Sequence, residues 1–315
     1  MKMLVAYLDL LGFRDHLSDS VNDTLRSLSH YAEVFAIKSQ EIGWTPQEQG
    51  LREPARAHSV DTFDYFLPFS DSIVIASSKE PNIFIRQIAS FLCGAFTFNS
   101  KSFDPIPMQM EGRDNPLEEK ESKLGRSADD HRPLSQEKYL NYPVLFRGGL
   151  SYGDVESLTM LSRVKGVSQS ATLLAGQGVV DAVKLEESKI KGPRILFDQD
   201  VFDTLSKENQ LGFCRKVPEE LHSTYYELLW PNASCFDSNF SNPNYGEIVD
   251  LYGKAIALRD HYDHAECHMH YCKFSELILA SAMAGAKVRK QHTELQEHLR
   301  ELVKRYNFSE KYNDL

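Results

Sequence analysis

The feature that most constrains this chain is an apolar segment near its start that ends in a single carboxylate. Residues 3–9 read Met-Leu-Val-Ala-Tyr-Leu-Asp, and a Gly-Phe pair follows at 12–13. A segment that is apolar on both faces and stops at a glycine-containing turn is typical of a buried strand. A second unit of this kind places Asp71 between apolar residues, and one amphipathic helical pattern separates the two units. Two strands that bracket a helix can meet at one edge of a sheet, so we expect Asp9 and Asp71 to lie close together.

Paired carboxylates predict a site for divalent metal ions. Mg²⁺ and Mn²⁺ prefer oxygen ligands, and two ions held ~3.5–4 Å apart can activate a hydroxyl and neutralise the leaving group of an in-line displacement. The Leu10 carbonyl is the expected further metal ligand. The amides of Leu11, Gly12 and Phe13 are expected to face outward at a helix start, where they would bind phosphate oxygens. Either aspartate alone is more often a turn residue, so the prediction depends on the pair.

Hydrophobic periodicity predicts an α+β fold. The expected elements are a strand at 3–9, a helix at about 21–35, strands at 59–69 and 72–77, a helix at 81–97, a strand at 144–155, a helix at about 168–187, strands at 194–197 and 225–230, and helices over 245–306. Residues 101–135 are polar and rich in Pro, Gly and charge, which favours a mobile insertion. Pro68 cannot donate to a neighbouring strand, so we expect its strand near an edge. The order β-α-β-β-α-β matches the ferredoxin-like split βαβ arrangement, with additions.

The composition is that of a folded protein without an obvious polymer partner. The 315 residues are long for one compact domain, and we expect a core domain at 1–205 and a C-terminal strand and helical extension at 206–315. The net charge of −10 argues against nucleic-acid and anionic membrane partners, because both favour clustered Lys and Arg. No apolar run approaches the length of a membrane span, and the start lacks a signal pattern. The five scattered cysteines favour reduced thiols, so we expect a cytoplasmic protein.

Three motifs together resemble those of a known family. They are Tyr-Leu-Asp-Leu-Leu-Gly-Phe at 7–13, Phe-Ser-Asp-Ser-Ile-Val at 69–74, and Phe-Arg-Gly-Gly-Leu-Ser-Tyr-Gly at 146–153. In this order they resemble the core motifs of class III nucleotidyl cyclases, most closely the bacterial pyrimidine (uridylate or cytidylate) cyclases of Pycsar anti-phage defence. The resemblance covers about residues 3–190, and it implies a ferredoxin-like class III cyclase core.

The resemblance implies an activity, metals and partners. The chain would convert a nucleoside triphosphate to a 3′,5′-cyclic monophosphate plus pyrophosphate. Asp9, the Leu10 carbonyl and Asp71 would hold two Mn²⁺ or Mg²⁺ ions, and a homodimer would form its active sites between the protomers. The cyclic product would be a second messenger of phage infection that a separate effector protein senses.

One predicted helix departs from the family's pattern. Cyclases of this class carry Gly-x-x-Val-Asn-x-Ala-x-Arg, in which the Asn and Arg orient the ribose and stabilise the transition state. The matching segment 176–184 has Val180 in place of the Asn and Lys184 in place of the Arg. A lysine keeps the positive charge but loses the planar fork of an arginine. Lys184 is therefore either a catalytic charge or a solvated helix charge.

The positions that would read the base point to a pyrimidine. Purine cyclases of this class place polar residues four before the second metal aspartate and two before the helix glycine, and these positions are Leu67 and Leu174 here. The Lys/Asp pair that would read adenine is therefore absent. Tyr65 shares a strand face with Leu67, where it either contacts a base or belongs to the core. On the family's habits we expect UTP as the substrate, with CTP as the alternative that no residue excludes.

Other features leave alternatives open. Arg147 either reaches a phosphate or is a structural charge, and we favour the structural role, with the neighbouring glycines serving backbone packing. The segment 259–272 is dense in His, Cys and Asp, and His264 and His268 would share a helix face as a zinc pair does, but no ligand pattern completes a site. The chain as a whole is either an active pyrimidine cyclase or a cyclase-like domain that has lost its chemistry and binds nucleotide or protein as a sensor. Cyclisation of ATP or GTP is a third, less favoured reading.

Overall fold

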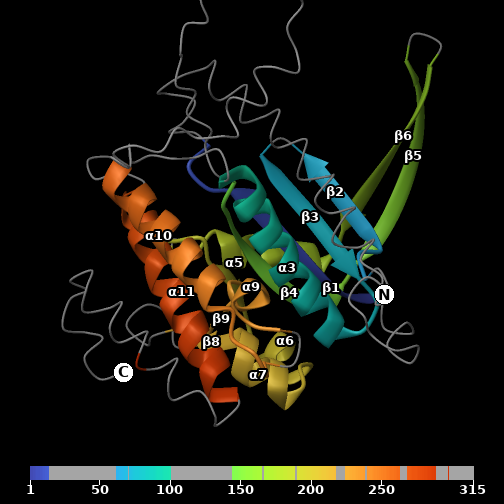
Figure 1. Ribbon diagram of the computed structural model, residues 1–315. Coiled ribbons are helices and arrows are strands. Elements are labelled where there is room, and N and C mark those ends of the chain that lie inside the picture. Colours follow the sequence, from blue (N-terminus) through green and yellow to red (C-terminus); the bar gives the residue numbers. More distant parts are fainter. Residues whose placement is uncertain are drawn as a thin grey trace, which may run out of the picture.

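The computed structural model describes residues 1–13, 62–69, 71–100, 144–164, 167–188, 190–217, 224–237, 240–262, 268–288 and 297. At its centre lies a seven-stranded mixed sheet in the order β2-β3-β1-β4-β7-β9-β8 (Figure 1). Its strands are β1 (Lys2–Leu10), β2 (Tyr65–Phe69), β3 (Ser72–Ser77), β4 (Phe146–Asp154), β7 (Ile195–Phe197), β8 (Cys214–Lys216) and β9 (Tyr226–Leu228). The predicted α+β class is confirmed.

β1 lies inside the sheet, with β3 on one side and β4 on the other, and both neighbours run antiparallel to it. Its residues are apolar on both faces, and they alternate between two cores with the period of a strand. Leu4 and Ala6 belong to the larger core cluster, whereas Met3 and Val5 belong to a second cluster on the opposite face. Asp9 continues the row of Met3 and Val5, which places it on the face of the second cluster.

Helices cover both faces of the sheet (Figure 1). They are α3 (Pro81–Ser100), α5 (Gln177–Glu186), α6 (Gln199–Asp203), α7 (Lys207–Phe213), α9 (Asn232–Cys235), α10 (Tyr245–His261) and α11 (His268–Val288). Side chains of α3, α10 and α11 fill the larger cluster, and α5 contributes Ala182 to the second cluster. Within the described ranges, no helix combines the length and the apolar character that a bilayer crossing needs.

Six predicted elements are confirmed with small changes of bounds, namely the strands at 3–9, 72–77, 144–155, 194–197 and 225–230 and the helix at 81–97. The predicted strand at 59–69 begins only at Tyr65, because Asp64 instead accepts hydrogen bonds from the amide and hydroxyl of Ser78. β2 lies at one end of the sheet order, which confirms the edge position expected from Pro68.

The helix predicted at 168–187 is wrong over its first half. β6 (Val167–Ala175) pairs antiparallel with β5 (Glu156–Val164), and α5 begins only at Gln177. Val164 pairs with Val167, so the connection has the two-residue length of a tight hairpin. The apolar residues near 171–175 are compatible with a helix or a strand. They form a strand here because they pair with β5.

The β5–β6 hairpin projects away from the seven-stranded sheet (Figure 1). Leu158 lies directly opposite Leu173, and Met160 continues the same face. These three side chains are 45–60% exposed. The hairpin therefore presents an apolar face outside both core clusters.

The strand order β2-β3-β1-β4, with both neighbours of β1 antiparallel to it, is the order that a split βαβ arrangement requires. The helix predicted at about 21–35 would complete the first crossover, but it lies outside the described residues, as does the insertion expected at 101–135. The ferredoxin-like core therefore stays a prediction. β8 and β9 join the same sheet as β1, and the domain boundary expected after residue 205 also stays a prediction.

A buried ionic network joins the far side of the sheet to the C-terminal helices. Glu227 of β9 is fully buried and lies 3.3 Å from the guanidinium of Arg194, which is 4.0 Å from Glu276 of α11. The Nε of Arg215 donates to Glu227 at 2.5 Å.

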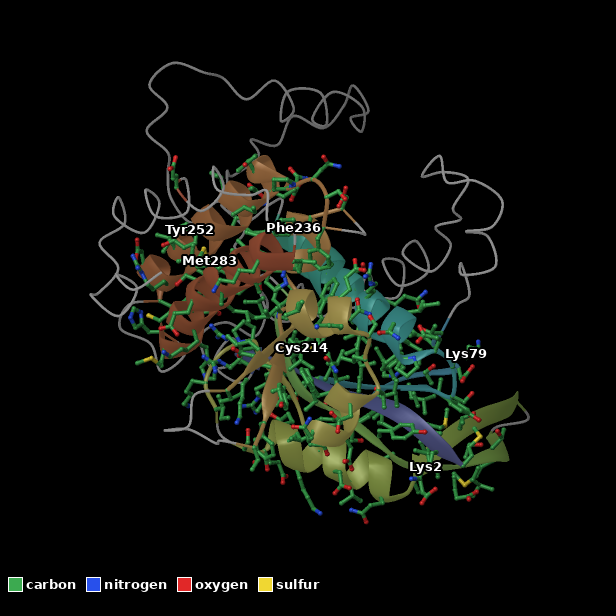
Figure 2. The ribbon with its side chains drawn as sticks, turned by 90° about the horizontal axis from the view of Figure 1, so that it is seen from below. Lys2, Lys79, Cys214, Phe236, Tyr252 and Met283 are labelled. Carbon is green, nitrogen blue, oxygen red and sulfur yellow. The ribbon has the colours of Figure 1, made fainter. Side chains whose placement is uncertain are left out.

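Figure 2 shows how the two ends of the molecule differ. Tyr252 of α10 and Met283 of α11 lie side by side among the C-terminal helices, where both belong to the larger core cluster. Lys2 and Lys79 lie at the opposite end, where β1 begins and β3 has ended. Asp9 belongs to the other end of β1, because it is one residue before the strand's last residue.

Candidate functional site

The structure brings Asp9 and Asp71 together at the end of two neighbouring strands. Asp9 lies opposite Ser72 in the antiparallel register of β1 and β3. One residue further, the Leu10 amide donates to the Asp71 carbonyl at 2.9 Å. The negative charge of Asp71 is close enough to help raise the pKa of Asp9. Two carboxylates that are far apart in the sequence therefore share one sheet edge.

The Asp9 carboxylate is held on both of its oxygens. Ser72 Oγ donates to Oδ1 at 3.0 Å, and the Tyr7 hydroxyl is 3.1 Å from Ser72 Oγ. Arg147 donates to Oδ2 from Nε and from Nη2, each at 3.2 Å. Burial raises the pKa of Asp9 above its ordinary value, the hydrogen bond from Ser72 and the charge of Arg147 oppose that shift, and Asp71 adds to it.

A third carboxylate completes this cluster. Glu186, at the end of α5, places Oε1 2.6 Å from Arg147 Nε, and its side chain is only 8% exposed. Burial raises the pKa of Glu186, the charge of Arg147 opposes that shift, and Asp9 adds to it. The sequence analysis identified neither Glu186 nor the bonding of Arg147 to Asp9. Tyr7 and Ser72 were also missed, although period two along β1 and β3 would have indicated both.

Glycines set how closely α5 approaches the sheet. A Cβ at Gly149 would lie 2.1 Å from the Ala182 carbonyl, and a Cβ at Gly153 would lie 2.9 Å from the Gly178 backbone. Only glycine allows backbones this close, so α5 rests directly on β4. This supports the expected packing role of these glycines, and it brings Glu186 within reach of β4 and β1.

The predicted base-reading positions lie on one apolar surface. Tyr65, Leu67 and Leu174 are partly buried and pack against the second core cluster, on the same face of the sheet as Tyr7. The Tyr65 hydroxyl donates to Ser157 Oγ at 3.0 Å. These residues come from β2, β1 and the β5–β6 hairpin, so the fold collects them from distant parts of the sequence.

The turn after β1 corrects one expectation. The Leu11 amide donates to the Leu145 carbonyl at 2.7 Å and its side chain is buried, so this amide does not face outward to a phosphate. Gly12 has a φ of 77°, which favours glycine at this position. Phe13 is partly buried against the larger core cluster. The turn is therefore tied to Leu145, the residue directly before β4.

Lys184 is exposed and pairs with an aspartate of its own helix. Its side chain is 64% exposed, and its ammonium lies 3.2 Å from Asp181 one turn earlier on α5. Val180 is also exposed on this helix, at 47%. Within one protomer the structure thus supports the solvated-charge reading of Lys184.

The residues present fit divalent cations. Asp9, Asp71 and the Leu10 carbonyl supply hard oxygen donors. Arg147 lies between the carboxylates of Asp9 and Glu186, and the negative charge of Asp71 also acts on Asp9. In the described part of the chain, no three His, Cys, Asp or Glu side chains form a metal-binding cluster, and a site here depends on carboxylate pairs with backbone oxygen. His264, which would share a helix face with His268, lies outside the described residues. His268 Nε2 is 3.3 Å from Cys272 Sγ, and its Nδ1 is 3.1 Å from the Arg259 carbonyl.

A comparison with solved structures finds nucleotide cyclases that are similar to this chain. No protein-family model matches the sequence, and no curated protein matches it. A bacterial light-regulated adenylyl cyclase is similar at 15% identity and a TM-score of 0.42, over 72% of this chain and 51% of that one. The guanylyl cyclase Cya2 is similar at 11% identity and a TM-score of 0.39, over 73% and 92%.

A class III adenylyl cyclase-like ATP-binding protein from Pseudomonas aeruginosa is similar at 15% identity and a TM-score of 0.31, over 67% of this chain and 36% of that one. This chain spans about half the length of the light-regulated adenylyl cyclase. All of these TM-scores are below 0.5. The neighbours are cyclases or cyclase-like, and the activity of this chain has to follow from the residues of its own site.

Proposed function

We propose that this chain is a pyrimidine nucleotide cyclase that converts UTP to 3′,5′-cyclic UMP and pyrophosphate, with CTP as the alternative substrate. The observation that carries the proposal is the meeting of Asp9 and Asp71 at adjacent strand ends, linked by the Leu10–Asp71 hydrogen bond of 2.9 Å. An apolar surface with two tyrosines lies on the same face of the sheet. A triphosphate bound through metal ions and a base bound on that surface would suit this arrangement.

Asp9, Asp71 and the Leu10 carbonyl would hold two Mn²⁺ or Mg²⁺ ions. The raised pKa of Asp9 supports this, because burial of the carboxylate outweighs the hydrogen bond from Ser72 and the charge of Arg147, and a bound cation would stabilise the charged form further. When bound, such ions lower the pKa of an attacking hydroxyl and neutralise the charge of a phosphate leaving group.

In the reaction the ribose 3′-oxygen bonds to the α-phosphorus, the bond from that phosphorus to the pyrophosphate oxygen breaks, and the hydroxyl proton passes to solvent.

Ser72 and Tyr7 would hold the metal ligand Asp9 in position for this reaction. Ser72 and Tyr7 fix the rotamer of Asp9 through their chain of hydrogen bonds. A fixed carboxylate matters because positioning supplies much of the rate of such displacements.

The substrate preference follows from the apolar base surface. Leu67 and Leu174 offer no hydrogen-bonding side chain for a purine edge, and the Tyr65 hydroxyl can bond to a smaller ring. Phe69 is 48% exposed with its ring 6.1 Å from that of Tyr7, which adds an aromatic face next to Asp9.

A homodimer with shared sites would explain the position of Lys184. Its exposed ammonium pairs with Asp181 rather than with Asp9 or Asp71, and it would reach a triphosphate only from the partner. The cyclic product would act in the cytoplasm as a second messenger in anti-phage defence and would be sensed by a separate effector protein.

A direct assay tests this proposal. The purified protein is incubated with Mn²⁺ and each of the four ribonucleoside triphosphates, and the products are separated by chromatography. We expect cyclic UMP, or cyclic CMP, plus pyrophosphate. Product from ATP or GTP alone would overturn the pyrimidine assignment, and no cyclic product from any of the four would overturn the enzyme assignment.

Replacement of Asp71 links the activity to the site. Asp71→Ala removes a metal ligand, so turnover should fall by at least about a thousandfold. The matched control is Asp250→Ala, because Asp250 is an exposed residue on α10 that pairs with Lys254. Full activity of Asp71→Ala would show that the metals bind elsewhere.

A cyclase-like sensor without chemistry is the second candidate, and two observations favour it. Lys184 is paired with Asp181, and Arg147 already bonds to Asp9. Such a domain would bind UTP with a measurable heat in calorimetry and leave it unconverted in the assay above.

A further inference from the structure

Arg147 occupies an oxygen that a metal ion at Asp9 would need. Arg147 lies opposite Asp9 in the antiparallel register of β1 and β4, so the two side chains share a sheet face. Its Nε and Nη2 both donate to the same oxygen, Asp9 Oδ2, at 3.2 Å. A cation and this guanidinium would repel one another at such a distance, and binding of the cation requires that Arg147 moves.

Glu186 offers the guanidinium a second acceptor. Glu186 Oε1 is 2.6 Å from Arg147 Nε, but the Nε hydrogen is directed to Asp9. Within the described residues, this buried oxygen has no hydrogen-bond partner of good geometry. A small rotation of the guanidinium would exchange the bond to Asp9 for a bond to Glu186. The arrangement is thus one guanidinium between two carboxylates, and its hydrogen bonds to this pair go to Asp9.

The other charged groups nearby do not replace Glu186 in this role. Asp71 lies on the same side as Asp9 and belongs with the metal ligands. His270 of α11 accepts a hydrogen bond from the Gly192 amide at 3.0 Å, and its pKa is lowered to about 4 by burial and by the charges of Lys191 and Arg147. A neutral, buried histidine gives Arg147 no compensating charge. An arginine displaced from Asp9 without Glu186 would be left partly buried and without an acidic partner, which is unfavourable.

We infer that Glu186 is a positioning residue that takes Arg147 from Asp9 when divalent cations bind. This inference rests on the proposed metal site and deepens it. Glu186 would not touch the metals. By accepting a hydrogen bond from Arg147, it would lower the free energy needed to move Arg147 away from Asp9 Oδ2. Metal binding and the movement of Arg147 would then be coupled.

The test measures Mn²⁺ binding directly, from the loss of the free Mn²⁺ signal in electron paramagnetic resonance. Glu186→Gln keeps the shape of the side chain and removes its charge, and we expect Mn²⁺ to bind about tenfold more weakly. The matched control is Glu187→Gln, which removes the same charge from the exposed neighbouring residue and should change Mn²⁺ affinity less than about twofold. Equal affinity of Glu186→Gln and the wild type, or an equal loss in both variants, would overturn the inference.

A double-mutant cycle separates positioning from simple charge. Arg147→Gln removes the competing donor, so Mn²⁺ should bind more tightly than in the wild type. Adding Glu186→Gln to that variant should then change the affinity less than about threefold, because the two residues act through each other. A full tenfold loss in the Arg147→Gln background would show that Glu186 acts on the metal by its charge alone. Circular dichroism checks folding, and Arg147→Met replaces the glutamine variant if that variant does not fold.

The outcome is independent of turnover. A wild-type protein that makes no cyclic nucleotide but shows this Mn²⁺ pattern would refute the proposed function and leave the role of Glu186 intact. If the wild-type protein makes cyclic UMP but Glu186→Gln binds Mn²⁺ as tightly as the wild type, the proposed function stands and the role of Glu186 is refuted. Mn²⁺ binding that is absent, or unchanged by Asp9→Asn, would overturn the inference itself.

Discussion

At the scale of single residues, Asp9 is a largely buried carboxylate that must be ionised to bind a metal ion. Its side chain is 18% exposed, and burial raises its pKa although Ser72 and Arg147 both bond to it. A group whose pKa is raised on folding binds its proton more tightly in the folded protein than in the unfolded chain. Its contribution to stability is therefore present in acid and is lost as the pH rises through the raised pKa.

Asp9→Asn should therefore stabilise the metal-free protein at neutral pH while it abolishes turnover. We expect a Tm that is about 2–4 °C higher than that of the wild type at pH 7.5, and a difference that shrinks as the pH falls toward 4. Scanning calorimetry at several pH values measures it. A lower Tm for Asp9→Asn at pH 7.5 would contradict this account.

Asp64 provides a control, because its pKa is shifted in the opposite direction from that of Asp9. Burial raises its pKa, but the hydrogen bonds from Ser78 and the nearby Lys79 outweigh burial, and the net pKa is lowered. Its stabilising contribution is present above the ordinary Asp pKa and is lost in acid. Asp64→Asn should thus be less stable than the wild type at pH 7.5, and the deficit should shrink as the pH falls.

The sequence indicated the aspartates but not the residues that surround them. Asp9 and Asp71 each end or begin an apolar run, and local pattern alone finds such positions. Glu186 sits at a helix end with no local signal, and its contact with Arg147 depends on how α5 docks on β4. That docking is set by the contacts of Gly149 with Ala182 and of Gly153 with Gly178, which lie far apart in the sequence, and periodicity does not encode them.

At the scale of elements, the packing of α5 on β4 controls the geometry of the site. The helix carries Glu186 and Lys184, and its backbone touches β4 at Gly149 and Gly153. Any change in that distance moves Glu186 relative to Arg147. The site therefore depends on residues that have no chemistry of their own.

Gly149→Ala should destabilise the protein and weaken its activity. Its Cβ would lie 2.1 Å from the Ala182 carbonyl, and overpacking of this kind costs about 1–3 kcal/mol. Urea unfolding measures the loss. Gly253→Ala is the matched control, because nothing lies within 4 Å of its new Cβ in α10, and alanine should stabilise that helix by roughly 0.5–1 kcal/mol. Equal stability of the two variants would contradict the close approach of α5.

The hairpin is the element that sequence reasoning missed. Residues 168–175 were predicted as the first half of a helix, since the short apolar stretch near 171–175 fits both periods. The two-residue connection after Val164 was the available signal, because two strands joined by a pair that contains glycine form a tight hairpin. The helix at 81–97, by contrast, was predictable because its apolar stripe is long and the larger core covers it.

At the scale of the whole molecule, Glu227 holds the last strands of the sheet to the C-terminal helices. It is fully buried between Arg194 and Arg215, and removing one partner of a buried ionic network leaves charge uncompensated. Glu227→Ala should cost about 3–5 kcal/mol of unfolding free energy.

Glu208→Ala is the control for that variant. Glu208 pairs with Arg86 at 3.6 Å while 40% exposed, so its loss should cost less than about 1 kcal/mol. Urea unfolding of both variants makes the comparison, and a Glu227→Ala protein as stable as Glu208→Ala would refute the structural role of the network.

Shared active sites predict complementation between two inactive variants. If each site combines Asp71 of one protomer with Lys184 of the other, mixed dimers of Asp71→Ala and Lys184→Ala contain one intact site. Co-expression should then restore roughly a quarter of the wild-type turnover, because half of the dimers are mixed and each has one of two sites. Recovery of no activity, with mixed dimers confirmed by mass spectrometry, would place both residues within one protomer.

The central position of β1 also determines when this protein can fold during its synthesis. β1 begins at Lys2, yet its partner Arg147 on β4 is 138 residues downstream of Asp9. At ribosomal speed the strand waits on the order of ten seconds for that partner, with β3 able to pair with only one of its two edges. A nascent chain stalled before β4 should therefore be the form that chaperones bind, and the bond from Arg147 to Asp9 should form only after β4 emerges.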